Sequence, residues 1–341
     1  MSISVQRLTK RFGQAAAVDD ISFDVAENEF FAIVGASGCG KSTLLRLIAG
    51  LEEPTEGRIA LEGQVVSDPE TFIPPEARQV GFVFQSYALW PHLTVAGNVA
   101  FPAEAQGAGK QEAAARAAEH LRTVSLEDYA DRRPEALSGG QRQRVALARC
   151  LAGGARTILM DEPLANLDPH LRHVMEAELR AFHRRTGTTT VYITHDQREA
   201  MALADRMAVM QQGRFLQVGT PHEIYDRPAT ADVARFIGRG TILPVDLQEG
   251  AVRVNGSILP LRAEREGRGH LFVRPAQLDV TSPEGAHLIG QVQDVLYRGG
   301  IWEARIVSDA ATDPVEVDLH RPVGIGERIG LNVRTGWLLP G

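Results

Sequence analysis

The feature that most constrains the fold of this chain is a glycine-rich segment between an apolar run and a helix-forming run. Residues 29–34 (EFFAIV) predict a short buried strand, residues 35–42 (GASGCGKS) follow, and residues 42–49 (STLLRLIA) favour a helix. Three glycines within eight residues allow the backbone to curl, so that successive N–H groups point inward toward a polyphosphate. The segment therefore predicts a phosphate-binding loop (P-loop) on an α/β scaffold.

The lysine inside this loop is unusual for the chain. Of 36 basic residues only Lys10, Lys41 and Lys110 are lysines, so 36 − 3 = 33 are arginines. Because arginine is this chain's general surface cation, we interpret Lys41 as present for its chemistry. In a P-loop it reaches the β- and γ-phosphates, the Ser42 hydroxyl holds Mg²⁺, and the dipole of the following helix favours the same negative charge.

Further strand-like and helix-like segments alternate along the first 237 residues. Residues 157–160 (TILM) and 189–194 (TTVYIT) predict buried strands, and each precedes a helical stretch. Such alternation is typical of a parallel sheet covered on both faces. Residues 110–123 are rich in Ala and Glu and predict a helix. Together with residues 125–133 they predict a helical insertion between elements of the sheet.

The pattern changes after residue 236. Residues 238–240 (GRG) predict a hinge, and short alternating runs follow at 251–254, 270–273 and 301–306. The runs are separated by predicted turns, whose sequences are Asn-Gly, Pro-Glu-Gly and Gly-Gly. These features predict an all-β domain of about 100 residues, in the range of a small barrel.

Two acids, Asp161 and Glu162, end the strand predicted at 157–160. The carboxyl ends of parallel strands form the edge at which α/β proteins bind ligands. There Asp161 is expected to act on Mg²⁺ through a bound water, and Glu162 is expected to polarise the attacking water as general base.

A second anion-binding helix terminus is predicted at residues 137–141 (LSGGQ). Ser138 is a favourable N-cap, and the two glycines expose the first N–H groups of the helix that follows. One nucleotide does not need two such termini from the same chain.

These motifs occur in an order that resembles the ATPases of the ATP-binding cassette (ABC) family. The P-loop, Gln85 after an apolar strand, LSGGQ at 137–141, the Asp161–Glu162 pair, Leu167-Asp168 and a late His195 all match, over residues 1 to about 237. In that family LSGGQ of one subunit completes the nucleotide site on the P-loop of the other. The resemblance therefore implies a head-to-tail homodimer that clamps two ATP molecules with Mg²⁺.

The resemblance also implies roles for single residues. Phe12 lies where the family has an aromatic residue that stacks on adenine, Gln85 resembles the residue that senses Mg²⁺, and His195 resembles the switch histidine that contacts the γ-phosphate and orients Glu162. Ala165 departs from the family, which often has serine there. The predicted catalytic residues are Lys41, Glu162 and His195, the predicted metal ligands are Ser42, Gln85 and Asp161, and the predicted nucleotide-binding residues are Phe12, Gly35, Ala36, Ser37, Gly38, Cys39, Gly40, Lys41, Ser42, Thr43, Gln85, Ser138, Gly139, Gly140, Gln141 and Asp161.

The implied fold is an α/β P-loop NTPase of the ABC type followed by a small all-β domain. The ATPase domain spans residues 1–237, has a mixed sheet, and contains a helical subdomain at about 87–155; a hinge covers 238–241. Residues 242–341 resemble the regulatory oligonucleotide/oligosaccharide-binding (OB)-like domain of maltose-, polyamine- and ferric-iron-type importer ATPases, with residues 273–275 (VRP) and 297–300 (YRGG) as its recurring elements.

Other members of the family fit less well. The 138 − 85 = 53 residues between Gln85 and Ser138 leave no room for the coiled coil of DNA-repair proteins. Translation factors usually carry two cassettes, whereas this sequence shows one P-loop. Exporters often fuse the cassette to membrane helices, which this sequence does not show. An OB-like domain could bind nucleic acid, but residues 242–341 carry 10 arginines and 13 acids, a net charge of 10 − 13 = −3, and the whole chain carries −7. A groove for a phosphate backbone should be positive.

The expected function is that of the ATP-hydrolysing subunit of an importer for a small solute or ion. Ferric iron, polyamine, sulfate and phosphonate classes are favoured, with maltose-type sugars or a non-transport ABC ATPase as alternatives. Permease subunits are expected to bind residues 85–95, where Leu89 and Trp90 are expected to be exposed, and an extracytoplasmic solute-binding protein acts indirectly. No run of 18 apolar residues occurs, so we expect a cytoplasmic protein on the inner face of the membrane.

Overall fold

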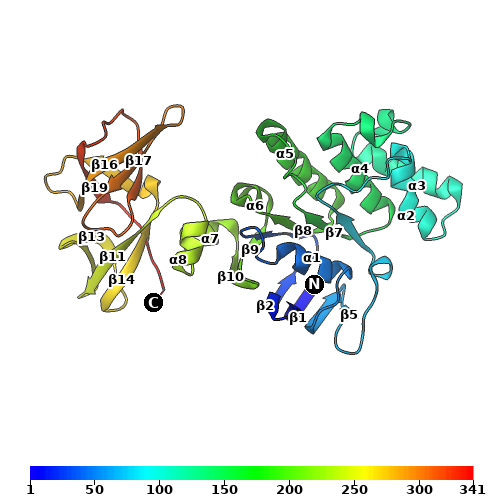
Figure 1. The fold of residues 1–341 in the computed structure, drawn as a ribbon, viewed down its shortest axis with the longest axis horizontal. Coiled ribbons are helices and arrows are strands. Elements are labelled where there is room, and N and C mark those ends of the chain that lie inside the picture. The colour runs from blue at the N-terminus through cyan, green and yellow to red at the C-terminus, as the bar shows by residue number, and fades with distance from the viewer. Residues whose placement is uncertain (341) are drawn as a thin grey trace. The chain divides into compact units, whose positions relative to one another are not determined.

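The computed structural model describes residues 1–340, which form two compact units. The first unit runs from Met1 to Pro221 and the second begins at His222 (Figure 1). The first unit is built on two sheets with helices, and the second is built mainly on strands. The predicted fold class, a P-loop α/β unit followed by an all-β unit, is confirmed.

The central sheet of the first unit has six strands in the order β10-β9-β3-β8-β7-β6. They are β3 (Phe30–Val34), β6 (Val80–Val83), β7 (Thr157–Asp161), β8 (Thr189–Thr194), β9 (Arg206–Gln211) and β10 (Arg214–Gly219). β3, β6, β7, β8 and β9 run parallel, and β10 pairs antiparallel with β9. The sheet is therefore mixed, and the ends of β3, β6, β7 and β8 meet at one edge.

A second, antiparallel sheet accompanies it in the order β2-β1-β4-β5. Its strands are β1 (Ile3–Phe12), β2 (Ala15–Val25), β4 (Glu56–Leu61) and β5 (Gln64–Ser67). Neighbouring residues of the central strands alternate between two cores, as the two-residue period of a strand requires. Phe31 and Ile193 pack with helix α1 (Lys41–Ala49) and the antiparallel sheet, whereas Phe30 and Tyr192 pack with side chains of the other helices.

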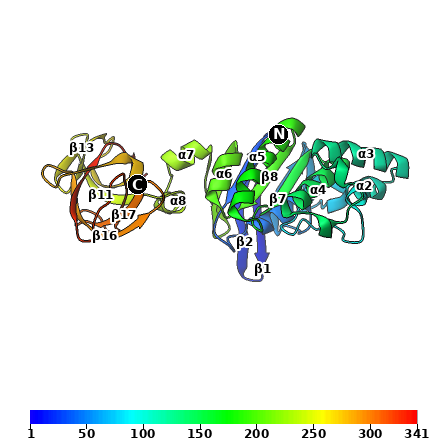
Figure 2. The same cartoon turned by 90° about the horizontal axis from the view of Figure 1, so that it is seen from above.

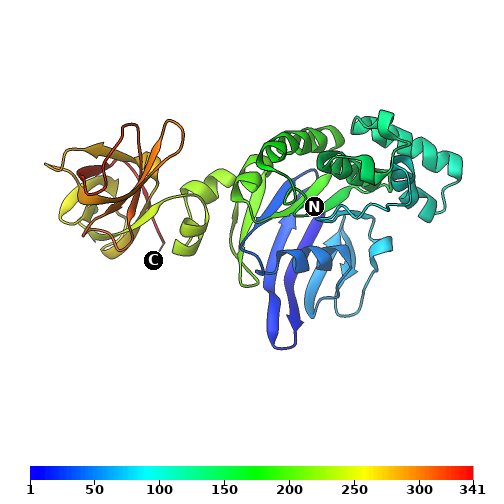
Figure 3. The same cartoon turned by 45° about the horizontal axis from the view of Figure 1, so that its top comes forward.

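Three helices lie between β6 and β7 in the chain: α2 (Val95–Ala105), α3 (Lys110–Thr123) and α4 (Gly139–Ala152). All three views place α2 and α3 together at one end of the first unit (Figure 2, Figure 3). The helix predicted at 110–123 has the predicted limits, but residues 125–133 contribute only a single short 3₁₀ helix. The remaining helices of this unit are α5 (Pro169–Thr186) and α6 (Gln197–Leu203), with 3₁₀ turns η1 (Pro75–Ala77), η2 (Glu127–Tyr129) and η3 (Pro134–Ala136).

The second unit contains two five-stranded antiparallel sheets, β13-β12-β11-β14-β20 and β15-β19-β16-β17-β18. The strands are β11 (Thr241–Gln248), β12 (Ala251–Val254), β13 (Ser257–Arg262), β14 (Gly267–Val273), β15 (Leu278–Thr281), β16 (Leu288–Tyr297), β17 (Trp302–Val307), β18 (Val315–Leu319), β19 (Arg328–Val333) and β20 (Trp337–Leu338), with the 3₁₀ turn η4 (Pro275–Gln277). The sheets share one core, so that Leu243 packs in the same cluster as Val292. Figure 2 shows the barrel-like arrangement.

Two short helices, α7 (Pro221–Asp226) and α8 (Ala231–Phe236), precede the strands of the second unit. Arg274, 3% exposed, donates hydrogen bonds to the carbonyls of Tyr225, Ile237 and Arg239 and lies over the rings of Tyr225 and Phe272. These contacts attach the helical segment to the strands. The ATPase domain limit at residue 237 and the hinge at 238–241 stay predictions, because a functional domain and a compact unit need not end at the same residue.

Candidate nucleotide-binding and hydrolysis site

The P-loop connects the end of β3 to the start of α1, as the sequence predicts. Gly40 has φ +108°, in the left-handed region that favours glycine. A Cβ atom at Gly40 would lie 2.0 Å from the carbonyl oxygen of Ala17, and one at Gly35 would lie 2.3 Å from that of Met210. These backbone contacts leave no room for a side chain, so the glycines determine the shape of the loop.

Lys41, the first residue of α1, lies folded against the loop. Its side chain is buried, and its Nζ donates hydrogen bonds to the carbonyl oxygens of Gly35, at 2.8 Å, and Ala36, at 3.1 Å. The ammonium group of Lys41, which could bind a polyphosphate, thus binds carbonyl oxygens of its own loop in this structure. Lys41 therefore lies where a P-loop lysine is expected.

The strand ends bring Ser42 and Asp161 together. The Ser42 hydroxyl donates a hydrogen bond of 2.9 Å to Oδ1 of Asp161, although the two residues are 119 positions apart in the chain. Burial raises the pKa of the Asp161 carboxyl, and the Ser42 hydroxyl and Arg46 partly offset this effect. Two oxygen donors in contact at a phosphate-binding loop match the oxygen ligands that Mg²⁺ prefers.

Glu162 and His195 follow neighbouring parallel strands, β7 and β8, and meet beyond their ends. Nδ1 of His195 lies 2.9 Å from Oε2 of Glu162. Glu162 has φ +45°, a strained conformation for a residue other than glycine, and its N–H donates to the carbonyl of Ile193. Such strain is common at functional sites, where the surrounding structure maintains it.

Gln85 lies beyond the end of β6, next to the loop of residues 164–168. Its carbonyl oxygen accepts a hydrogen bond of 3.1 Å from the side-chain amide of Asn166. The loop begins with a turn in which the N–H of Ala165 donates to the carbonyl of Glu162. Within residues 1–340 no hydrogen bond joins the exposed Gln85 side chain to Ser42 or Asp161, so its predicted contact with Mg²⁺ stays a prediction.

The LSGGQ segment forms the N-terminus of α4, with Ser138 as N-cap. Ser138 and Gln141 form a reciprocal capping box, in which the Ser138 hydroxyl accepts from the N–H of Gln141 and the Gln141 side chain accepts from the N–H of Ser138. Ser138 is exposed. In the described part of the chain no hydrogen bond or ion pair joins Ser138 or Gln141 to the P-loop.

Phe12, the last residue of β1, presents a ring that is 51% exposed. The ammonium of Lys10 lies 5.0 Å from its centroid. The exposed face suits stacking on a planar base, which agrees with the role the sequence predicts.

The expectation that Leu89 and Trp90 are exposed is wrong, because both are half-buried. The ring of Trp90 lies 4.2 Å from that of Phe101, and the guanidinium of Arg149 lies 5.1 Å from it. Arg149, itself 7% exposed, also donates to the carbonyls of Tyr87 and Ala88. Sequence reasoning missed Arg149, since nothing in its local pattern distinguishes it from a surface arginine.

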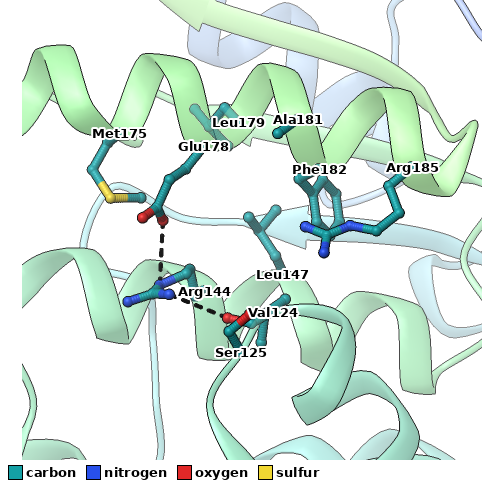
Figure 4. A pocket seen from close by; sticks show the side chains of 10 residues that line it. All are labelled: Val124, Ser125, Arg144, Leu147, Met175, Glu178, Leu179, Ala181, Phe182 and Arg185. Atoms are coloured by element: carbon teal, nitrogen blue, oxygen red, sulfur yellow. Dashed lines mark hydrogen bonds and ion pairs between the residues drawn. The ribbon is translucent and has the colours of Figure 1, made fainter.

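A separate pocket of about 160 Å³ lies between α4, α5 and the turn after α3 (Figure 4). Buried apolar side chains such as Leu147, Leu179 and Phe182 line it, and an ion pair of 3.3 Å between Arg144 and Glu178 crosses it. It contains none of the predicted catalytic or nucleotide-binding residues. This pocket is therefore separate from the predicted nucleotide site at the open sheet edge, which stays a prediction.

Comparison with known proteins agrees with this geometry. A family model described as ABC transporter matches residues 18–165. The chain is 42% identical over 357 residues to the spermidine/putrescine import ATP-binding protein PotA of Nitratidesulfovibrio vulgaris, covering 98% of this chain and 96% of that protein. The chain belongs to the ABC transporter family. It is an importer-type ABC ATPase, and its hydrolysis of ATP is coupled to transport.

Other relatives of this ABC ATPase carry different substrate names. It is 41% identical to the Fe(3+) ions import ATP-binding protein FbpC of Rhizobium etli (91% of this chain, 89% of that protein). It is 50% identical to the trehalose/maltose import ATP-binding protein MalK of Thermococcus litoralis (67% and 62%). A solved dimeric ATP-binding cassette bound to ADP and Pi, 32% identical, has a TM-score of 0.56 and covers 64% of this chain and 98% of that one.

None of the described helices combines the length and the apolar character that crossing a bilayer requires.

Proposed function

We propose that this ABC ATPase energises the import of a small solute or ion, with polyamines, ferric iron, sulfate and phosphonate as the favoured classes. The main observation in support of the proposed site is the 2.9 Å contact between His195 and Glu162, which follow the strands next to Lys41, Ser42 and Asp161. Relatives named for spermidine/putrescine, Fe(3+) and sulfate/thiosulfate support the substrate classes. The relative named for trehalose/maltose keeps maltose-type sugars as the second candidate.

In the proposed mechanism Lys41 neutralises charge on the β- and γ-phosphates, and the N-terminus of α1 binds the same oxygens. Glu162 accepts a proton from the attacking water, because its carboxylate lies just beyond β7 in contact with His195, whereas the Asp161 carboxylate is engaged by Ser42. His195 holds that carboxylate through its ring nitrogen and contacts the γ-phosphate on its other side. Phe12 stacks on the adenine.

The donor set fits a magnesium ion. The Ser42 hydroxyl and the Asp161 carboxylate, 2.9 Å apart, are the oxygen ligands proposed to hold it, with Gln85 as a further ligand. When bound, the ion would neutralise charge on the β- and γ-phosphate oxygens.

Two copies are proposed to act together, head to tail, so that Ser138 to Gln141 of one subunit faces the P-loop of the other. The capping box uses the N–H of Gln141, and the N–H groups of Gly139 and Gly140, which the first turn of a helix cannot pair within the helix, are proposed to bind an anion. The relative whose structure is titled as a dimeric cassette bound to ADP and Pi supports this arrangement.

Permease subunits are proposed to bind residues 85–95, which would place the protein on the cytoplasmic face of the membrane. The test is co-purification from native membranes with a tagged chain and identification of the bound permease and solute-binding proteins. Leu89→Asp, with Ala136→Asp as a control at an exposed position outside this segment, should lose the permease and retain ATP binding. If permease capture is unchanged by Leu89→Asp, the proposed docking segment is wrong; the proteins captured identify the substrate class.

A further inference from the structure

One arginine joins the two loops that flank the candidate catalytic pair. Arg172 lies in the first turns of α5 and is 25% exposed. Its Nη2 donates to the carbonyl oxygen of Leu167 at 3.4 Å, and its Nη1 donates to Oδ2 of Asp196 at 3.3 Å. Leu167 belongs to the loop after Glu162, and Asp196 is the residue after His195. A single side chain therefore links both loops.

The third contact of Arg172 reaches a buried acid. Its Nε lies 3.4 Å from Oε1 of Glu199, which is 3% exposed. The other oxygen of Glu199 accepts hydrogen bonds of 2.7 Å from the hydroxyls of Tyr192 and Thr194. Burial raises the pKa of Glu199, and these two hydroxyls and Arg172 lower it. The guanidinium is thus the cation that compensates a carboxyl inside the protein.

This network holds the backbone on both sides of His195. The Thr194 hydroxyl, already bound to Glu199, accepts a hydrogen bond of 2.9 Å from the N–H of Asp196. His195 itself is 49% exposed, and among the described residues its one side-chain hydrogen bond is to Glu162. Because about half of the side chain is exposed, its position depends largely on the position of its two neighbours.

We propose that Arg172 is a positioning residue for ATP hydrolysis. By tying Leu167, Asp196 and Glu199 together, it keeps His195 at hydrogen-bond distance from Glu162. The inference rests on the roles proposed above for His195 and Glu162. In the described part of the chain no hydrogen bond or ion pair joins Arg172 to either of them, so it acts through the loops that carry them.

The experiment compares Arg172→Met, which keeps the length of the side chain and removes every donor, with Arg172→Lys, which keeps the charge but cannot reach three acceptors at once. Arg180→Met, at an exposed position of the same helix, is the control. We expect kcat of Arg172→Met to fall about 10- to 100-fold, since small misplacements of catalytic groups have effects of this size. Binding of a fluorescent ATP analogue to the folded protein should be retained, although the unfolding temperature should fall because the buried Glu199 loses its cation. Arg172→Lys should recover part of kcat.

A double-mutant cycle separates positioning from a structural role. In a His195→Ala background, Arg172→Met should cause no further loss of kcat, because its effect passes through His195. The proposal is overturned if the two losses multiply, or if folded Arg172→Met keeps the parental kcat. If His195→Ala alone keeps the parental turnover, the role proposed for His195 fails, and the Arg172 proposal fails with it.

A second variant covers the case in which Arg172→Met does not fold. Asp196→Asn keeps the size of the side chain and one oxygen for the cap of α6, and it removes the charge that faces Nη1 of Arg172. The same loss of kcat with retained nucleotide binding supports the proposal. A folded Asp196→Asn protein with parental kcat overturns it.

Discussion

The P-loop edge and the LSGGQ segment are both helix N-termini, yet the chain completes them differently. At the edge, residues from three strand ends meet: Lys41 binds loop carbonyls, Ser42 binds Asp161, and His195 binds Glu162. At the other terminus, within residues 1–340, the side chains of Ser138 and Gln141 bond to the backbone N–H groups of each other, and Ser138 is exposed. The contrast suggests that hydrolysis chemistry is assembled within a chain, whereas the second anion site is presented for another chain.

The largest expected effect is at the edge. Lys41→Ala should reduce ATP turnover to background, because it removes the charge proposed to contact the β- and γ-phosphates. The fold should persist, since Nζ of Lys41 bonds to carbonyl oxygens of its own loop. Turnover and circular dichroism measure the two effects, and Lys110→Ala, at an exposed position that begins α3, is the matched control. Parental turnover in Lys41→Ala contradicts the P-loop assignment.

The next effect separates chemistry from binding at the same edge. Glu162→Gln should lower kcat by about 10²- to 10⁴-fold, the usual range for loss of a general base. ATP binding should survive, and the loss of negative charge near the γ-phosphate should favour the ATP-bound dimer. Light scattering with ATP should show doubled mass. A variant that binds ATP but stays monomeric at high concentration contradicts the two-chain site.

The LSGGQ segment is tested in that background. Adding Ser138→Arg to Glu162→Gln should return the ATP-bound protein to a monomer, because the longer side chain fills the space in front of the exposed terminus of α4. Binding of ATP should remain close to that of Glu162→Gln alone, since among the described residues no hydrogen bond joins Ser138 to the P-loop of its own chain. If dimers persist with Ser138→Arg, the terminus is not part of the dimer contact.

The smallest effect on turnover is expected from removing the second unit. Chains ending at residue 221 or at residue 240 keep every predicted catalytic residue, and both should retain ATP hydrolysis. The two truncated chains should differ in solubility. The chain ending at residue 240 keeps α8 but loses Phe272, against which Ala234 of α8 packs, and it also loses the Arg274 contacts. The longer chain should therefore aggregate more readily in gel filtration. If a folded truncation fails to bind ATP, the predicted position of the nucleotide site is wrong.

Much of the edge could be predicted from the sequence because its determinants are local. Glycines mark the loop between β3 and α1, and acids mark the end of β7. The same holds for a turn of the second unit: Asn255 and Gly256, both with positive φ, form the turn predicted between two of its strands. Each of these signals lies within a few residues of the structure it specifies.

The arginines were harder to interpret. Treating arginine as the general surface cation concealed Arg78, Arg149 and Arg274, which are 5%, 7% and 3% exposed. Arg149 binds residues 61 and 62 positions away, and Arg274 binds carbonyls 35 to 49 positions away. Contacts of this kind depend on tertiary packing, which leaves no periodic pattern in the sequence.

The scarcity of lysine has a practical consequence for chemical labelling. Lys41 is buried under its loop, and Lys10 is engaged by the carbonyl of Glu53 and the carboxylate of Glu52. Lys110, at the start of α3, is exposed. Among the three lysines, a limiting amount of an amine-reactive dye should therefore attach mainly at Lys110. A fluorophore on Lys110 would report directly on the helical region between β6 and β7 without any introduced cysteine.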